Sequence, residues 1–277
     1  MNISRLLSVA PMMERTDRHC RYFFRLLSQQ TLLYSEMINA NAITKGNKTR
    51  LLNFSEIEHP LALQIGGSDP KLLAEATKIG VDWGYDEINL NVGCPSSRVS
   101  SGDFGAVLMK RKDHVAKCVD AMAQFSSNVP ISVKCRIAVD DQDPEKILPS
   151  FIKTVSNSGV SIFIIHARKA ILSGLSPKDN RKIPPIDYNL VKKIKTQFPQ
   201  LEICLNGEIK DLSTVMNFIN DGINGCMIGR EVYKNPSKIL ENADEKIFKK
   251  MDLFRKSKKR TLYEALLKMI PYLESHL

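Results

Sequence analysis

Glu87-Ile88-Asn89-Leu90-Asn91-Val92-Gly93-Cys94-Pro95 is a short strand-like run followed at once by a turn that carries a reactive side chain, and strand-like runs of this kind repeat along the chain. Short apolar or β-branched runs recur eight times in the first 230 residues, at 6–10, 31–34, 61–65, 87–91, 131–136, 161–166, 201–206 and 224–228. Segments with helical character separate most of them, at 70–79, 114–125, 144–157, 188–197 and 212–220. This alternation predicts a parallel sheet covered by helices.

Eight strand–helix units predict a (β/α)8 TIM barrel, and the 277 residues suffice for one such barrel with a small appendage. A doubly wound open sheet is the alternative, but it usually has a G-x-G-x-x-G turn after the first strand, and none follows residues 6–10. We therefore predict a barrel over residues 1–235 and a short, basic helical region over residues 236–277.

Composition and charge narrow the class of protein. Hydrophobic residues make up 43% and charged residues 25%, as is typical of a soluble globular protein. With no signal-peptide pattern and no long apolar run, we expect a cytoplasmic protein with no membrane partner. The net charge is +10, and residues 230–277 contribute half of it, with 12 Lys and Arg against 7 Asp and Glu. Clustered cations favour a polyanionic partner, although a merely basic surface is the simpler reading.

The six cysteines are scattered and form no C-x-x-C pair. This spacing predicts neither a metal site nor a disulfide framework. Cys135, Cys204 and Cys226 lie in strand-like runs and are expected in the core.

Polar and reactive residues stand at the same end of all eight predicted strands. Because barrel enzymes build their sites from the loops that follow the strands, this joint placement predicts an active site there, although each residue alone could be structural. The strand ends carry 11–13, Glu36, 64–67, 91–95, Lys134 with Arg136, 166–169, 206–207 and 229–230.

The last two strand ends resemble the usual phosphate site of a barrel. Asn206-Gly207 and Gly229-Arg230 let backbone amides approach an anion, and Arg230 can grip it through two nitrogens. With Lys134, His166 and Gln64 at the same mouth, the arrangement suits a phosphorylated aromatic cofactor such as FMN. A Schiff-base aldolase that uses Lys134 as nucleophile is the rival interpretation, but it leaves Cys94 unexplained.

Cys94 lies in a turn flanked by glycine and proline, which can present a side chain rigidly to the barrel mouth. An ordinary thiol is mostly protonated at neutral pH, so Cys94 suits a general acid better than a resting nucleophile. The alternative is that Cys94 is a small buried hydrophobic residue with only a structural role.

The chain resembles the tRNA-dihydrouridine synthase family, in particular its bacterial A subfamily. The resemblance is carried by residues 8–22, 63–70, 84–96, 166–170, 174–178 and 180–181, which occur in the order of the family's motifs and include Asn91-Val92-Gly93-Cys94-Pro95-Ser96. It covers about the first 235 residues. It implies an FMN-binding barrel that takes hydride from NADPH and reduces the C5–C6 bond of a flipped-out uridine in the D-loop of tRNA.

The resemblance also implies a role for each matching residue. Cys94 is the implied proton donor to C5, Asn91 lies against the target base, and Lys178 and Arg181 contact tRNA. The implied flavin-ring contacts are Pro11, Met12, Met13, Gln64, Lys134 and His166, and the implied phosphate contacts are Asn206, Gly207, Glu208, Gly229 and Arg230.

Two departures from the family pattern affect what we expect. Glu208 replaces a glycine that many members carry, and its carboxylate should weaken phosphate binding somewhat. Family members continue into a longer helical RNA-binding region, so residues 230–277 are expected to be an incomplete one. An FMN barrel acting on a free pyrimidine and a non-catalytic RNA-binding remnant remain alternatives, and we expect a monomer.

Overall fold

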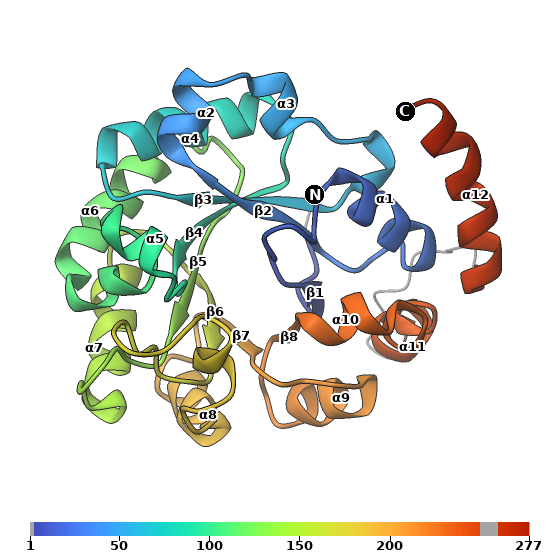
Figure 1. The fold of residues 1–277 in the computed structure, drawn as a ribbon. Helices are drawn as coiled ribbons and strands as arrows, with labels where there is room; N and C mark the ends of the chain where they lie inside the picture. The colour runs from blue at the N-terminus through green and yellow to red at the C-terminus, as the bar shows by residue number, and fades with distance from the viewer. Residues whose placement is uncertain (1–2, 250–259, 277) are drawn as a thin grey trace.

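The computed structural model describes residues 3–249 and 260–276, and its centre is a ring of eight parallel strands (Figure 1). Each strand pairs with the next in chain order, and β1 pairs with β8. Between β1 and β2 the ring is closed by backbone hydrogen bonds from Val9 N to Leu32 O (2.9 Å) and from Leu32 N to Leu7 O (3.1 Å). The predicted TIM barrel is confirmed. The strands are β1 (Leu7–Val9), β2 (Leu33–Asn39), β3 (Leu61–Gly66), β4 (Glu87–Val92), β5 (Ile131–Arg136), β6 (Ile162–His166), β7 (Glu202–Asn206) and β8 (Gly225–Ile228).

Helices surround the ring, and several begin with the same capping device. The aspartates Asp17, Asp69, Asp143, Asp187 and Asp211 each accept a hydrogen bond from a backbone amide in the first helical turn. This satisfies donors that helix starts leave unpaired, and so marks where loops end and helices begin. The α-helices of the barrel are α1 (Arg18–Leu27), α2 (Ala40–Lys45), α3 (Lys48–Leu52), α4 (Pro70–Asp82), α5 (Ser97–Ser101), α6 (Lys112–Ala123), α7 (Pro144–Ser156), α8 (Tyr188–Gln197), α9 (Leu212–Asn220) and α10 (Arg230–Lys234), with short turns of helix at η1 (Glu56–Glu58), η2 (Gly105–Lys110) and η3 (Asp179–Arg181).

Alternation along the strands divides the core into two parts. On β4, Ile88, Leu90 and Val92 belong to the large apolar cluster shared with the helices. The alternate residues must point the other way, into the barrel. A smaller apolar cluster fills part of that interior, and includes Tyr34, Ile164 and Met227. The buried cysteines Cys135, Cys204 and Cys226 confirm the core prediction made for them.

The second strand is longer than predicted. It was expected at residues 31–34 but extends from Leu33 to Asn39, past the polar pair Ser35 and Glu36. Its register against β3 shifts between Tyr34 and Met37. Such an irregularity lets a strand continue through residues that interrupt its apolar pattern, and the sequence pattern alone does not reveal it.

The start of the predicted C-terminal region packs on the barrel. Ile239, Ile247 and Phe248, from α11 (Pro236–Leu240) and η4 (Asp244–Phe248), are buried in the same apolar cluster as the barrel helices. The carboxylate of Asp244 accepts hydrogen bonds from Ser28 Oγ (2.6 Å) and from the backbone amide of Gln29 (2.8 Å). The division at residue 235 thus lies inside one continuous core, and an RNA-binding role for residues 236–277 stays a prediction.

The last described helix, α12 (Leu262–Glu274), lies beside α1 (Figure 1). The ring of Tyr272 stacks on Tyr22 with centroids 3.8 Å apart, and its hydroxyl hydrogen-bonds to His19 Nδ1 at 3.0 Å. The basic stretch 250–259, part of the predicted RNA-binding region, lies outside the described residues. No helix within 3–249 or 260–276 is both long enough and apolar enough to cross a lipid bilayer.

Candidate active site

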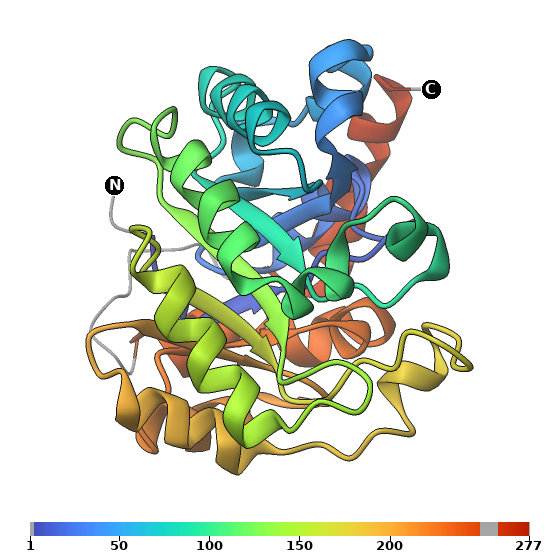
Figure 2. The ribbon, with the colours of Figure 1, turned by 90° about the vertical axis from the view of Figure 1, so that its left-hand side faces the viewer.

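The predicted site residues gather at the end of the barrel where the strands finish. Figure 2 shows the segment after β4 and the segment after β6 projecting from the same side of the ring. Because the strands are parallel, the residues that end β5, β7 and β8 lie at this mouth as well. The joint placement predicted from the eight strand ends is therefore present in the fold.

The turn that carries Cys94 is held by hydrogen bonds from several directions. Asn91 Oδ1 accepts from the backbone amides of Gly93 and Cys94, both at 3.0 Å. The carbonyl of Cys94 accepts from the amide of Ala106 at 2.9 Å. Gly105 has a φ of +77°, and a Cβ there would lie 2.7 Å from that carbonyl oxygen. Only glycine fits so close to the turn, which therefore presents a half-buried Cys94 in one defined position.

Arg136 joins this turn to the loop after β6. Its Nε donates to the carbonyl of Gly93 at 3.1 Å, and its Nη1 lies 3.3 Å from the carbonyls of both Lys169 and Asn180. The guanidinium is buried, and burial together with the nearby Arg181 and Arg168 lowers its pKa to about 10. The guanidinium of Arg136 thus holds the turn after β4 and the loop after β6 in fixed positions relative to each other.

Basic side chains crowd the mouth. We call the following six residues the mouth cluster: Lys134, Arg136, His166, Arg168, Arg181 and Arg230. Burial and then the neighbouring Arg136 lower the pKa of Lys134 to about 8. The pKa of His166 lies well below its usual range, because the ring is buried and four of the other five cations repel its charged form. The pKa of Arg181 is lowered by burial and by Arg230. These groups repel each other's charge, so an anion would relieve the repulsion.

Glu208 partly offsets this charge. Its carboxylate lies 2.8 Å from Arg168 Nη2, while Arg168 Nη1 donates to the carbonyls of Lys182 and Pro184. The carboxylate expected to oppose phosphate is therefore engaged by an arginine, which reduces its effect on an anion at the mouth.

Three polar atoms of the mouth cluster are buried and have no hydrogen-bond partner within the described part of the chain: His166 Nδ1, Arg168 Nε and Arg181 Nε. Buried polar atoms are normally satisfied, and exceptions in native proteins often mark a place where a ligand or water binds. The same mouth that concentrates positive charge thus also has hydrogen-bonding capacity left over.

The predicted phosphate residues lie together. Lys134 Nζ donates to Asn206 Oδ1 at 3.1 Å, and Asn206 Nδ2 donates to the carbonyl of Met227 on β8 at 2.8 Å. Gly207 has a φ of +126°, and a Cβ there would lie 3.6 Å from His166 Cε1. The positive φ favours glycine at this position, and the residue lies next to the imidazole of His166.

The loop after β1 lies next to the predicted phosphate residues at the end of β8. A Cβ on Gly229 would lie 3.9 Å from Met12 Sδ, so the first and last strand ends meet. Thr16 N donates to the carbonyl of Met12 at 3.0 Å, and Arg21 fixes Thr16 by donating to its carbonyl at 2.9 Å.

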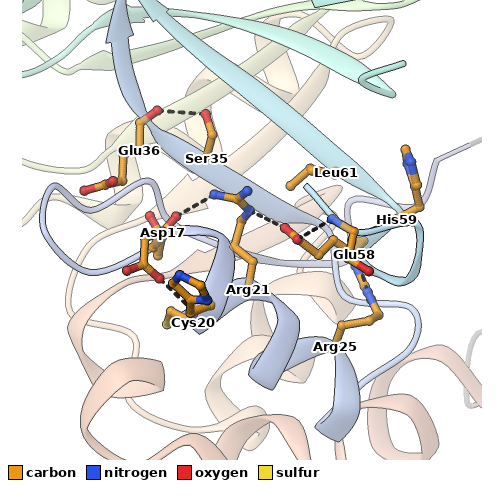
Figure 3. Close-up of polar contacts among 12 residues, drawn as sticks. Asp17, Cys20, Arg21, Arg25, Ser35, Glu36, Glu58, His59 and Leu61 are labelled. Atoms are coloured by element: carbon orange, nitrogen blue, oxygen red, sulfur yellow. Dashed lines mark hydrogen bonds and ion pairs between the residues drawn. The ribbon is translucent and has the colours of Figure 1, made fainter. Parts of the chain in front are cut away.

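Figure 3 shows Arg21 extending from α1 to its buried partner Glu58, with an Nε–Oε2 distance of 2.7 Å. The ion pair anchors the start of α1, and thereby the loop that carries Met12. Within that loop Pro11 and Met12 are half-buried, whereas the side chain of Met13 is 58% exposed. Of the three predicted flavin supports, Met13 is the one that faces solvent most.

Gln64 and Asn91 contact each other. Asn91 Nδ2 donates to Gln64 Oε1 at 2.7 Å, and Gln64 Nε2 donates to Asn89 Oδ1 at 2.7 Å. The side chain of Asn91 thus serves the Cys94 turn and Gln64 at once. Its predicted contact with a target base, and the predicted contact of Gln64 with a flavin, stay predictions.

The loop after β6 brings one of its two predicted tRNA contacts to the mouth. Asn180 is fully buried and closes the loop, because its Nδ2 donates to the carbonyl of Ile171 at 2.8 Å and its Oδ1 accepts from the amide of Ile171 at 2.7 Å. Arg181 follows it and lies near enough to Cys94 and Arg230 to interact with both. Lys178, in the same loop, is exposed.

Sequence reasoning did not assign roles to Arg136, Arg168 or Asn180. Arg136 donates to carbonyl groups of loops remote in sequence, whereas Arg168 and Asn180 donate to carbonyl groups within the segment after β6. No local sequence pattern reveals these contacts. One feature of the sequence did point to Arg136 and Arg168, because both stand at the ends of consecutive predicted strands. Burying a charged side chain there costs free energy unless it finds partners.

Comparison with known proteins gives the family. The family model described as "Dihydrouridine synthase (Dus)" matches residues 8–277. A protein of Synechocystis sp. named tRNA-dihydrouridine(20/20a) synthase is 50% identical over 98% of this chain and 79% of its own length. Proteins of the same name from Vibrio cholerae and Escherichia coli K12 are 51% and 54% identical, over 98% and 88% of this chain and 80% and 70% of their own lengths.

Solved structures support the fold. Morphinone reductase in complex with tetrahydroNAD has a TM-score of 0.58 and 10% sequence identity, covering 82% of this chain and 83% of its own. TcOYE with pHBA has a TM-score of 0.57 and 8% identity, covering 83% and 86%. The matched sequence spans both the Cys94 turn and the mouth cluster, and the chain therefore belongs to the dihydrouridine synthase family.

Proposed function

We propose that this protein reduces uridine in the D-loop of tRNA to 5,6-dihydrouridine, with FMN as bound cofactor and NADPH as the source of reducing equivalents. The observation that carries the proposal is that a rigidly held Cys94 and the mouth cluster occupy the same barrel mouth in a member of the dihydrouridine synthase family. A thiol can provide a proton there, and the surrounding cations favour both an anionic cofactor and a polyanionic substrate.

The residues at the mouth fit FMN. Asn206, Gly207, Gly229 and Arg230 would hold its phosphate at the ends of β7 and β8, where barrels commonly bind phosphate. Lys134 and the unpaired Nδ1 of His166 would face the more polar parts of the ring system, and Met12 would pack beside it. Glu208, paired with Arg168, leaves this arrangement mostly undisturbed.

The neutral state of His166 matters for this fit. Because the pKa of His166 is far below its usual range, the imidazole is uncharged at neutral pH and can offer both a donor and an acceptor nitrogen. Lys134, with a pKa of about 8, keeps a proton at neutral pH and can donate to an anionic edge of the cofactor.

When bound, reduced FMN supplies the hydride for C6 of the uracil ring. Cys94 donates the proton to C5, so that the double bond becomes a single bond and the ring gains one hydride and one proton. The hydrogen bonds from Gly93 and Cys94 amides to Asn91 hold the thiol in place for this transfer. A base must leave its stack to reach the barrel mouth, and Arg181 beside Cys94 would contact the backbone or the base as it enters.

Lys178, exposed on the same loop, would contact a phosphate further along the tRNA, and residues 236–277 would provide additional basic contacts. The low pKa of Lys134 would also suit a Schiff-base lysine. Family membership and the position of Cys94 favour the reductase, and in that reaction Lys134 needs no nucleophilic role.

The test is direct. Purified protein supplied with FMN and NADPH should form dihydrouridine in an unmodified tRNA transcript, measured by mass spectrometry after nuclease digestion, and the Cys94→Ala variant should form it far more slowly. Free uridine and uracil, assayed in parallel, address the rival reading of a pyrimidine reductase. If the free pyrimidines are reduced and tRNA is not, the proposed substrate is wrong; if the protein retains no flavin and reduces neither, the RNA-binding remnant is favoured.

A further inference from the structure

A column of polar side chains runs through the interior of the barrel beneath the Cys94 turn. Its members are Glu87, Asn89 and Asn91, which alternate on β4, together with Ser132 from β5 and Gln64 from β3, the two neighbouring strands (Figure 1). Glu87, Asn89 and Ser132 are fully buried, and the other two are nearly so. Burying five polar side chains in one column is costly unless each finds a partner.

Each member of the column is hydrogen-bonded to the next. Ser132 Oγ donates to Glu87 Oε1, and Asn89 Nδ2 donates to Ser132 Oγ at 2.7 Å. Gln64 Nε2 donates to Asn89 Oδ1 at 2.7 Å, and Asn91 Nδ2 donates to Gln64 Oε1 at 2.7 Å. At the upper end, Asn91 Oδ1 accepts from the backbone amides of Gly93 and Cys94.

The carboxylate of Glu87 fixes the direction of the whole chain. Its Oε2 accepts from Arg5 Nε at 2.7 Å, and its Oε1 also accepts from the hydroxyl of Tyr34 at 2.6 Å. A carboxylate in an ion pair can only accept, so Ser132 must donate to it and is left to accept from Asn89. Every amide above then has one allowed orientation.

The same direction is the one that the Cys94 turn requires. If the amide of Asn91 were reversed, its Nδ2 would face two backbone N–H donors, and the turn would lose both hydrogen bonds. Carboxamides of Asn and Gln have two orientations of almost equal shape, so packing alone does not choose between them. Glu87 at the lower end and the two backbone amides at the upper end therefore impose the same orientation on every carboxamide between them.

We propose that Glu87 and Ser132 are positioning residues for Cys94, acting through the hydrogen-bond chain Glu87–Ser132–Asn89–Gln64–Asn91. The effect on the reaction rests on the proposed function of Cys94 as proton donor. The effect on the turn itself does not, because it depends only on the hydrogen bonds within this chain.

Two variants interrupt the chain in different ways. Ser132→Ala removes a link in the middle. Glu87→Gln keeps the shape of the side chain but introduces an amide that can donate, so the lower end of the chain no longer imposes a direction on the carboxamides above it. Tyr34→Phe is the matched control, because it removes a donor to the same carboxylate without breaking the chain. All three are measured as flavin-loaded proteins, with thermal unfolding recorded to verify folding.

The first readout is the rate at which iodoacetamide alkylates Cys94, followed by mass spectrometry of the peptide that contains it. The second is the rate of dihydrouridine formation in tRNA. We expect faster alkylation and about tenfold slower dihydrouridine formation in Ser132→Ala and Glu87→Gln, the scale of one buried hydrogen bond. Tyr34→Phe should stay close to the unmodified protein in both.

If Cys94 is alkylated at the same rate in all three variants, the positioning role is refuted, even where dihydrouridine formation falls. If the unmodified protein forms no dihydrouridine but the alkylation rates still separate the chain variants from Tyr34→Phe, the proposed function fails and the ordering of the turn by Glu87 and Ser132 stands. The two failures are therefore distinguishable.

Discussion

Replacing Lys134 by methionine should make the flavin-free protein more stable and its hold on FMN weaker. Burial and the adjacent Arg136 lower the pKa of Lys134 from 10.5 to about 8. A shift of this size corresponds to about 3 kcal/mol of cost for keeping the ammonium charged in the fold at pH 7, at 1.36 kcal/mol per pKa unit. Methionine has a similar length and carries no charge, so it removes this cost.

This gain in the free energy of unfolding is partly offset by the loss of one hydrogen bond. Lys134 Nζ donates to Asn206 Oδ1 at 3.1 Å, and an acceptor left without a partner at a part-buried position costs about 1–2 kcal/mol. The net stabilisation of the flavin-free protein by Lys134→Met should therefore be about 1–2 kcal/mol at pH 7. Urea unfolding of both proteins, stripped of flavin, measures this difference.

The pH dependence of stability tests whether Lys134 destabilises the flavin-free fold. Between about pH 8 and pH 10.5 the folded protein has lost the Lys134 proton while the unfolded chain still holds it, so the stability of the unmodified protein rises with pH across this window. The advantage of Lys134→Met should be largest below pH 8 and shrink toward pH 10.5. Lys78→Met, which changes an exposed lysine paired with Asp82, serves as the control for replacing a lysine by methionine outside the barrel mouth.

Flavin binding should change in the opposite direction. Losing a charged donor to an anionic cofactor costs about 1.5–3 kcal/mol, so FMN affinity should fall about 10- to 100-fold in Lys134→Met, measured by quenching of flavin fluorescence. A variant that is less stable without flavin, or that binds FMN as tightly as the unmodified protein, would refute the reasoning that burial of an unpaired cation prepares this mouth for an anion.

Three further changes test other parts of the site. Cys94→Ala should leave reduction of the flavin by NADPH unchanged but sharply slow its reoxidation by tRNA, in stopped-flow absorbance, since only the second step needs the proton; equal loss in both steps would indicate a structural role. Arg181→Ala should weaken tRNA binding and reduce the slope of log affinity against log salt by about one, whereas an unchanged slope would remove it from the phosphate contacts. Asp244→Ala, which leaves the hydroxyl of Ser28 and a nearby amide without their acceptor, should lower the free energy of unfolding by about 2–4 kcal/mol, and no loss in urea unfolding would separate residues 236–248 from the barrel core.

The residues at the strand ends show how much of the candidate site can be predicted from patterns in the sequence. Cys94, Lys134, His166 and Asn206 were assigned to the barrel mouth because each lies in the last part of a predicted strand or follows one, and parallel strands bring their ends together. That inference needs only the number and direction of the strands. It needs no knowledge of which side chains touch.

Contacts between loops lay beyond such patterns. Arg136 bonds to carbonyls of Gly93 and Asn180, which are 43 and 44 residues away along the chain. The ion pair between Glu208 and Arg168 likewise could not be predicted from the sequence, in which Glu208 was only a departure from the family pattern. This ion pair reduces the effect that its carboxylate was expected to have on phosphate binding. Both depend on where loops of different length meet, and local propensity carries no information on that.

The barrel and the residues at its mouth follow from strand periodicity, the glycines at the turns and the number of strand–helix units, all of which can be read along the chain. How these residues act on one another follows from their positions in the folded protein. The pKa of Lys134 depends on burial among other cations, and the orientation of Asn91 depends on hydrogen bonds to the Cys94 turn on one side and to Gln64 on the other. Both effects arise from groups brought together by closure of the ring, since charge repulsion and hydrogen bonding act through space rather than along the chain.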